Sequence, residues 1–271
     1  MSRTLAGERV NGMFAQGRSG HRAALIGYLV GGDPDLSTSE LVIRAIAEAG
    51  LDLLELGVPY GDPVADGPTI AAAGQRALTA GMTLEQTFEL LERVQALLPV
   101  VLFTYYNPVF RYGVERFAAR AADAGACGVI IPDITLEEIE EVRGPLSARS
   151  LAIPLLISPT TAPARARRIA AASEGFVYVV SRMGVTGAGA EPDLGWLRDQ
   201  VTRLRQGTDK PLAVGFGIST PEQVGAVSGW SDAVIVGSGL VASYAGSVGE
   251  LAAQQAGSYV ASLAAARDGS A

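Results

Sequence analysis

Three acidic residues lie close together in the segment LELGVPYGDPVADGP, residues 54–68. The first, Glu55, interrupts an apolar run of strand length, in which Leu53, Glu55 and Gly57 would share one face. If that face points into the protein, the carboxyl group loses water, which raises its pKa and suits it to proton transfer. A glutamate paired with a buried arginine or with backbone amides fits the position equally well.

Asp62 and Asp66 follow on the same segment, each after a proline. A single aspartate in a loop is usually a turn residue or the N-cap of the next helix. Two acids on a proline-braced loop, directly after an inward-pointing glutamate, are less ordinary. We therefore expect the chemistry on this segment.

Two glycine-containing segments late in the chain predict a phosphate site. They are GFGIS (215–219) and the Gly237-Ser238-Gly239 triplet, and each follows a predicted strand. Glycines let the backbone approach phosphate oxygens, and a short helix then supplies N–H groups from its N-terminus. Between the two groups of candidates, SRMGVTGAGAEPD (181–193) is too long for a tight turn and is predicted to be a mobile lid.

The elements that must position these residues alternate regularly along the chain. The predicted strands are 23–30, 51–58, 100–106, 127–132, 152–158, 175–180, 211–217 and 232–238, and the predicted helices are 37–49, 83–97, 114–124, 135–149, 163–173, 192–206, 219–228 and 247–266, with an extra helix at 3–16. Eight strand–helix repeats predict an α/β fold, a single (β/α)₈ TIM barrel with an extra N-terminal helix that forms one domain over residues 1–271. A doubly wound open sheet is the alternative, but the first turn, GGDPD, lacks its glycine fingerprint.

Composition narrows the function. The net charge of −7 argues against nucleic acid as the main partner. No apolar run is long enough to cross a membrane, and a secretory signal is not apparent, so we expect a cytoplasmic protein. With one histidine and one cysteine, a zinc site is not expected. Cys127 lies in an apolar run, which favours a buried inert thiol over a nucleophile.

The sequence resembles the family of tryptophan synthase α subunits. The segment LELGVPYGDPVADGPTI (54–70) is similar to that family's signature, LELGVPFSDPxADGPxI, and further motifs agree in order: GDPD (32–35), YYNPVFRYGVERF (105–117), IIPDITLEE (130–138), SRMGVTGA (181–188), GFGIS (215–219) and VIVGS (234–238). The resemblance spans nearly the whole chain, and its combination of motifs is specific among barrels.

This resemblance implies a lyase of tryptophan biosynthesis that splits indole-3-glycerol phosphate into indole and glyceraldehyde 3-phosphate by a retro-aldol reaction. Glu55 then corresponds to the general acid/base and Asp66 to the carboxylate that binds the indole N–H. The implied substrate-binding residues are Tyr28, Tyr178, Thr186, Gly187, Phe216, Gly217, Gly237 and Ser238, with Thr186 on the lid and Tyr28 where the family often has phenylalanine.

The resemblance also implies a partner, a β subunit in an α₂β₂ complex. Asp62 and Asn107 would lie in that interface. Pyridoxal phosphate would belong to the β subunit, with no cofactor and no metal in this chain. The sequence departs from the family at Gly61, where serine is usual, at Val30-Gly31, and at Pro132 and Thr135. Because Gly61 adjoins Asp62, this departure bears on the coupling to a β subunit more than on the chemistry.

Three other functions stay open on the sequence alone. A stand-alone lyase would release free indole without a β subunit. A catalytically inactive barrel would only bind a partner, although the retained Glu55, Asp66 and lid speak against it. A different phosphate-binding barrel enzyme, such as an isomerase, would share GFGIS and VIVGS but not the ADGP loop.

Overall fold

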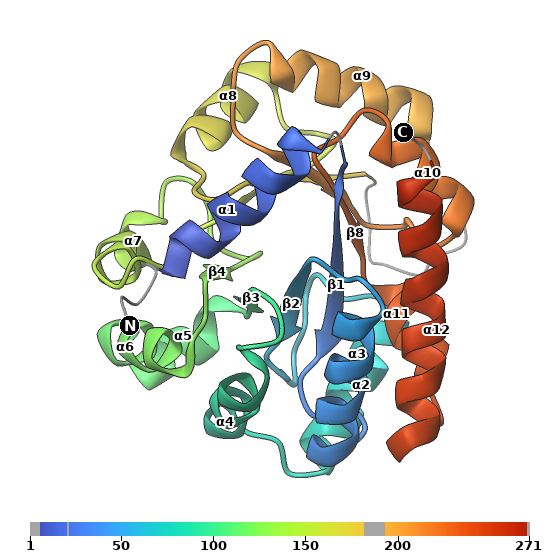
Figure 1. Cartoon of the computed structure of the whole chain (residues 1–271). Coiled ribbons are helices and arrows are strands. Elements are labelled where there is room, and N and C mark those ends of the chain that lie inside the picture. The colour runs from blue at the N-terminus through green and yellow to red at the C-terminus, as the bar shows by residue number, and fades with distance from the viewer. Residues whose placement is uncertain (1–5, 21, 182–192, 270–271) are drawn as a thin grey trace.

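A parallel sheet of eight strands curls into a barrel in the described part of the chain, as Figure 1 shows. The structure is a computed structural model, and it describes residues 6–20, 22–181 and 193–269. The strands are β1 (Ala24–Val30), β2 (Leu53–Gly57), β3 (Val100–Phe103), β4 (Gly128–Ile130), β5 (Leu155–Ile157), β6 (Val177–Val180), β7 (Leu212–Gly215) and β8 (Ala233–Val236). The predicted barrel is confirmed, and the open doubly wound sheet was the wrong alternative.

The sheet closes between its two outer strands, β4 and β5. The hydrogen-bonded order runs β4-β3-β2-β1-β8-β7-β6-β5, and a parallel bridge joins Gly128 of β4 to Ala152, just before β5. The predicted strand 152–158 is therefore too long. Pro154 interrupts it, because proline has no N–H group to give to the ladder.

Helices cover the outside of the barrel. They are α1 (Ala6–Ser19), α2 (Leu36–Glu48), α3 (Pro68–Thr79), α4 (Leu84–Val94), α5 (Tyr106–Tyr112), α6 (Val114–Ala124), α7 (Glu140–Ser147), α8 (Pro163–Ala172), α9 (Leu194–Arg205), α10 (Pro221–Ser228), α11 (Ser238–Tyr244) and α12 (Gly249–Asp268). The extra helix before the first strand is confirmed as α1, which ends three residues later than the predicted 3–16, and α7 begins later than expected. The sequence patterns did not predict α3 or α5. For α11 they predicted only that a short helix begins near Ser238.

One hydrophobic core joins the strands to the helices around them. The described strand residues are almost all buried, as expected for parallel strands covered on both faces. Helix α1 joins the same core through Phe14, whose ring lies 5.7 Å from that of Phe176. This continuity supports the proposal that residues 1–271 form one domain.

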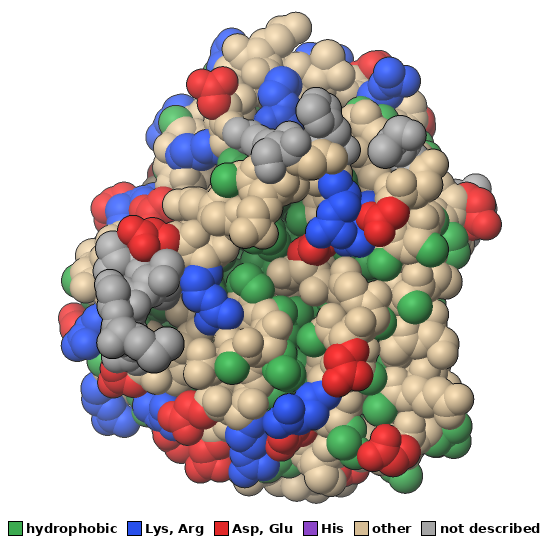
Figure 2. Space-filling view, viewed as in Figure 1, with side chains coloured by type: hydrophobic (Ala, Val, Ile, Leu, Met, Phe, Trp, Pro, Cys, Tyr) green, Lys and Arg blue, Asp and Glu red, His purple; other side chains and the backbone are tan. Residues whose placement is uncertain are grey.

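The surface carries no single-sign face in the view of Figure 2, where acidic and basic side chains are interspersed. Among the described residues, no helix combines the length and the apolar character that a membrane span requires. Cys127 is buried, as expected, and burial raises the pKa of its thiol.

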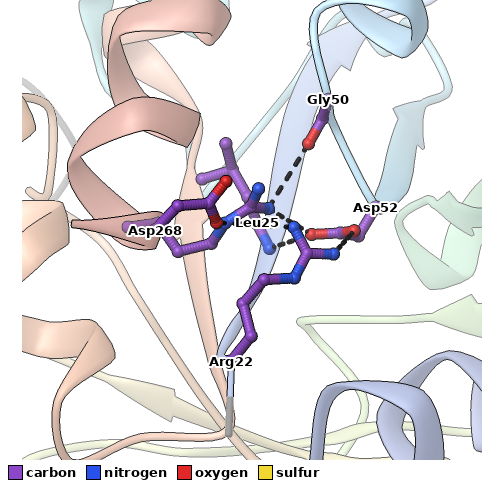
Figure 3. Close-up of polar contacts among 6 residues, drawn as sticks. Arg22, Leu25, Gly50, Asp52 and Asp268 are labelled. Carbon is purple, nitrogen blue, oxygen red and sulfur yellow. Dashed lines mark hydrogen bonds and ion pairs between the residues drawn. The ribbon is translucent and has the colours of Figure 1, made fainter. Parts of the chain in front are cut away.

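A charged cluster holds the end of the barrel at which the strands begin, and Figure 3 shows it in close-up. The Asp52 carboxylate, just before β2, accepts hydrogen bonds from the Leu25 N–H at 2.8 Å and from Arg22 at 2.6 Å. It also pairs at 2.5 Å with Arg267, a buried side chain in the last turn of α12. A single carboxylate thus ties β1, β2 and the last helix together.

We expect Arg267→Ala to lower the free energy of unfolding by about 3 kcal/mol, because it leaves a largely buried carboxylate with one charged partner fewer. Urea unfolding followed by circular dichroism measures this change. As a matched control, Arg165→Ala removes an arginine whose pair with Glu137 is exposed, and its midpoint should stay near that of the wild type. Equal losses in the two variants would contradict the role assigned to Arg267.

Candidate active site

A pocket opens at the end of the barrel where the strands finish. It encloses about 430 Å³ of empty space, part of it open to solvent. Its lining includes eight of the residues expected from the sequence: Tyr28, Glu55, Asp66, Tyr178, Phe216, Gly217, Gly237 and Ser238. The fold therefore brings residues from β1, β2, β6, β7 and β8 to one place.

Glu55 lies at the inner wall of this pocket. It pairs with Tyr28 across β1 and β2, and both side chains point inward, as the alternation of β2 predicted. The residue is fully buried, and neither carboxyl oxygen has a hydrogen-bond partner among the described residues. Loss of hydration raises its pKa to about 8. Within the described part of the chain, Glu55 is therefore paired neither with an arginine nor with backbone amides, the two alternatives to a proton-transfer role.

Asp66 approaches the same pocket from the loop between β2 and α3. Burial raises its pKa to about 6, and a hydrogen bond from the Tyr105 hydroxyl partly opposes this shift. Tyr105 also holds the loop itself, because its hydroxyl oxygen accepts a hydrogen bond from the Ala65 N–H at 3.0 Å. At pH 7 the pocket thus holds a mainly protonated Glu55 and a mainly ionised Asp66, an acid and an anion side by side.

The opposite wall is built from backbone. Phe216 adopts the left-handed conformation, with φ of 69°, and Gly217 follows with φ of 95°. The Ser181 hydroxyl donates to the Phe216 carbonyl, which holds this turn against the end of β6. Gly237 and Ser238 lead from β8 into α11 directly beside it. Main-chain N–H groups in such turns suit an anion.

Comparison with known proteins identifies this arrangement. The family model for the tryptophan synthase alpha chain matches residues 14–267. The chain belongs to the tryptophan synthase alpha chain family. It is 47% identical over 232 residues to the tryptophan synthase alpha chain of Methanosarcina acetivorans, covering 85% of this chain and 84% of the relative. It is 46% identical over 235 residues to that of a Picosynechococcus species, covering 86% and 89%.

Solved structures agree with the fold. A chain of tryptophan synthase from Mycobacterium tuberculosis superposes with a TM-score of 0.88 at 37% identity, covering 95% of this chain and 97% of the other. The α subunit from Legionella pneumophila superposes with a TM-score of 0.86 at 30% identity, covering 96% and 98%.

Within this family member, each pocket tyrosine lies over a glycine of the neighbouring strand. A Cβ atom on Gly57 would stand 2.5 Å from the Tyr28 hydroxyl, and one on Gly215 would stand 2.7 Å from the Tyr178 hydroxyl. The missing side chains therefore let both rings lie across the floor of the pocket. Tyr28 packs edge-on against Phe103 at 5.3 Å, and Tyr178 against Phe216 at 5.7 Å. The pocket therefore has aromatic rings from β1 and β3 on one side and from β6 and the turn after β7 on the other.

The predicted interface residues lie on the rim. Asp62 and Asn107 are exposed, and the Asn107 amide donates to the Tyr60 hydroxyl at 3.1 Å, which links the loops after β2 and β3. Nothing in the structure explains Gly61: a Cβ there would have only Leu78, 4.0 Å away, as a neighbour. Thr186 and Gly187, with most of the expected lid, lie outside the described residues.

Sequence reasoning missed three apolar residues of the pocket, Ile70, Phe103 and Ile235. Phe103 and Ile235 belong to β3 and β8, and the inward alternation of these strands could have pointed to them. Ile70 comes from the first turn of α3, a helix that the sequence patterns did not predict.

We expect Glu55→Gln to stabilise the protein above pH 8 and to change little near pH 5. The raised pKa of Glu55 favours folding only while the group is protonated, and this advantage disappears as the pH rises from the unfolded value toward about 8. Above pH 8 the gain of the variant should be on the order of 4 kcal/mol. Urea unfolding at pH 5 and pH 9 measures it, and an equal difference at both values would show that packing, not charge, is altered.

Proposed function

We propose that this chain is the α subunit of tryptophan synthase, a lyase that cleaves indole-3-glycerol phosphate into indole and glyceraldehyde 3-phosphate. One observation carries the proposal. In a member of this family, a buried carboxyl group with no hydrogen-bond partner among the described residues shares one pocket with aromatic side chains and with the glycine-containing turns after β7 and β8.

The pocket accommodates the substrate in one sensible orientation. The phosphate group would bind main-chain N–H groups at Gly217, Gly237 and Ser238. The indole ring would lie among Tyr28, Phe103 and the other apolar residues of the floor. The glycerol chain then spans the space in front of Glu55. Thr186 and Gly187 would complete the site from the lid.

The reaction then follows from the two protonation states. Neutral Glu55 donates its proton to C3 of the indole ring, while the Asp66 carboxylate binds the ring N–H and stabilises the positive charge that develops there. The Glu55 carboxylate next accepts the proton of the hydroxyl group on the carbon attached to C3. The bond between C3 and that carbon breaks, its electron pair restores the aromatic ring, and an aldehyde forms. Glu55 ends the cycle protonated, as it began.

Glu55 makes both proton transfers of this scheme and Asp66 balances the charge on the ring, so we assign no cofactor and no metal to the chain. Pyridoxal phosphate is assigned to the β subunit. We place the protein in the cytoplasm, and its single cysteine is consistent with a reducing compartment.

A β subunit is the proposed protein partner, in an α₂β₂ complex. The rim of the pocket supports this proposal, because it exposes two large apolar side chains, Val64 on the loop after β2 and Phe110 on α5. Exposed apolar groups near a binding site are typical of protein interfaces. Val64 lies on the same loop as Asp62, and Phe110 lies on α5 together with Asn107.

We expect the purified chain to release indole and glyceraldehyde 3-phosphate from indole-3-glycerol phosphate, and to turn over faster when a β subunit is added. Product analysis by chromatography, with and without the β subunit, tests this expectation. Full turnover by the chain alone would instead indicate a stand-alone lyase.

Glu55→Gln and Asp66→Asn should each reduce kcat at least a hundredfold, since each removes a group on which the scheme depends. Unchanged turnover in the Glu55 variant would contradict the mechanism.

The rim makes a separate prediction. Phe110→Asp should weaken the affinity for a β subunit by tenfold or more, because a charge replaces an apolar contact, and it should leave the activity of the isolated chain unchanged. Titration calorimetry measures the affinity. Val248→Asp is the matched control, since Val248 is equally exposed, at 64%, and precedes α12 on the side of the barrel opposite α5 in Figure 1. Equal effects of the two substitutions would place the interface elsewhere.

A further inference from the structure

A second buried carboxylate lies outside the pocket, in the turn that follows β1. Asp33 is 1% exposed. It accepts two hydrogen bonds from Arg76, at 2.7 Å from Nε and 2.9 Å from Nη2. Burial raises the pKa of Asp33, and the bonds from Arg76 only partly oppose that shift. The mechanism described above does not use this pair.

The pair joins the ends of two helices. Arg76 belongs to the last turn of α3. Tyr244, the last residue of α11, is buried beside the pair, where burial and the nearby Asp33 charge raise the pKa of its hydroxyl well above the usual value. Asp33 therefore binds the C-terminal end of α3, and its charge acts on the C-terminal end of α11, where the Tyr244 hydroxyl has no hydrogen-bond partner among the described residues.

The opposite ends of the same helices carry the active site. Helix α3 begins at Pro68, two residues after Asp66, and its Ile70 lines the pocket. Helix α11 begins at Ser238, in the proposed phosphate site. A displacement of either helix would move a group that touches the substrate.

The apolar packing of α3 offers little to prevent such a displacement. Apart from Ile70, its buried residues are Ala73, Gly74 and Ala77, whose small side chains make a smooth contact surface. Interlocking of larger side chains is what normally fixes the position of a helix along its axis. A two-pronged arginine–carboxylate pair is directional and can fix it instead. A buried ion pair adds little net stability over an apolar contact of similar size, so positional control is the advantage it offers here.

We propose that Asp33 is a positioning residue for the active site, acting through Arg76 on α3 and on the loop before it that carries Asp66. The inference deepens the proposed function, and its kinetic consequence rests on that function. Its structural consequence does not, because the surroundings of Asp66 can be measured without substrate.

The charged and titratable groups around Asp33 and around Asp66 determine how the proposal can be tested. Asp33 faces Arg76 and Tyr244, with Asp35 further along its own turn. Asp66 faces Tyr105, and its charge also acts on Tyr28. The shifted pKa of Asp66 has burial and the Tyr105 hydrogen bond as its causes, and Asp33 is not one of them. A change in the pKa of Asp66 on substitution of Asp33 would therefore report a moved loop and not a lost charge.

The test is a carboxyl ¹³C NMR titration of protein labelled at aspartate, with Asp66 identified by the signal that Asp66→Asn removes. In the wild type, Asp66 should titrate near pH 6. In Asp33→Asn its pKa should fall by about half a unit or more, because a displaced loop admits water. Asp52→Asn is the matched control: it breaks a buried pair with Arg267 at the opposite end of the barrel, and it should lower stability without moving the pKa of Asp66. The same pKa in the Asp33 variant and the wild type, or equal shifts in both variants, would overturn the proposal.

Arg76→Lys provides a second variant that keeps the positive charge and loses the two-pronged geometry. It should shift the pKa of Asp66 in the same direction by a smaller amount, and an unshifted pKa would count against the proposal if Asp33→Asn fails to fold. Kinetics with indole-3-glycerol phosphate complete the test. Asp33→Asn should raise KM and lower kcat, so that kcat/KM falls roughly tenfold. A purely structural role of Asp33 would lower only the melting temperature. A wild-type chain that does not cleave this substrate would refute the proposed function, and the titration would still decide the role of Asp33.

Discussion

The burial of Glu55 is the constraint that the rest of the molecule must satisfy. Burying a carboxyl group in an apolar wall costs folding free energy, and no donor among the described residues offsets that cost. The protein keeps the group neutral instead, and the proton it retains is the one that the proposed chemistry requires. The stability has to come from elsewhere: the continuous core of the barrel, and the charged cluster at the end opposite the pocket. The destabilising carboxyl group and the stabilising charged cluster thus lie toward opposite ends of the same barrel.

Much of this arrangement could be predicted from the sequence, because strand alternation and strand ends are local properties. In the run LDLLELGV, alternation shows which residues share a face with Glu55, and parallel strands bring all their C-terminal ends to one place. The glycines after β7 and β8 could be assigned for the same reason. The order of the elements was sufficient to predict the barrel, since few other folds repeat a strand and a helix eight times.

The remaining features of the fold and the site could not be predicted, because they depend on contacts between residues far apart in the sequence. Helix α3 has a short apolar stripe of alanines and a proline at its start, a weak helical signal inside what resembles a long loop. Without α3, neither Ile70 nor Arg76 could be placed. The Asp33–Arg76 pair joins residues 43 apart in the sequence, and the first aspartate of a GGDPD turn is more simply interpreted as a turn residue. The two tyrosine–glycine contacts likewise needed the register of neighbouring strands.

The cluster around Asp52 has a consequence for the newly made chain. Arg267 is synthesised 215 residues after Asp52, an interval of about 10 to 40 s at ordinary translation rates. During most of that time β1 also lacks β8, its partner on one side. The first half of the barrel is therefore attached to the ribosome with an unpaired strand edge and an incomplete ion cluster. Unpaired strand edges promote aggregation. For this protein, the speed of translation and the supply of chaperones bear on yield as directly as the stability of the finished fold.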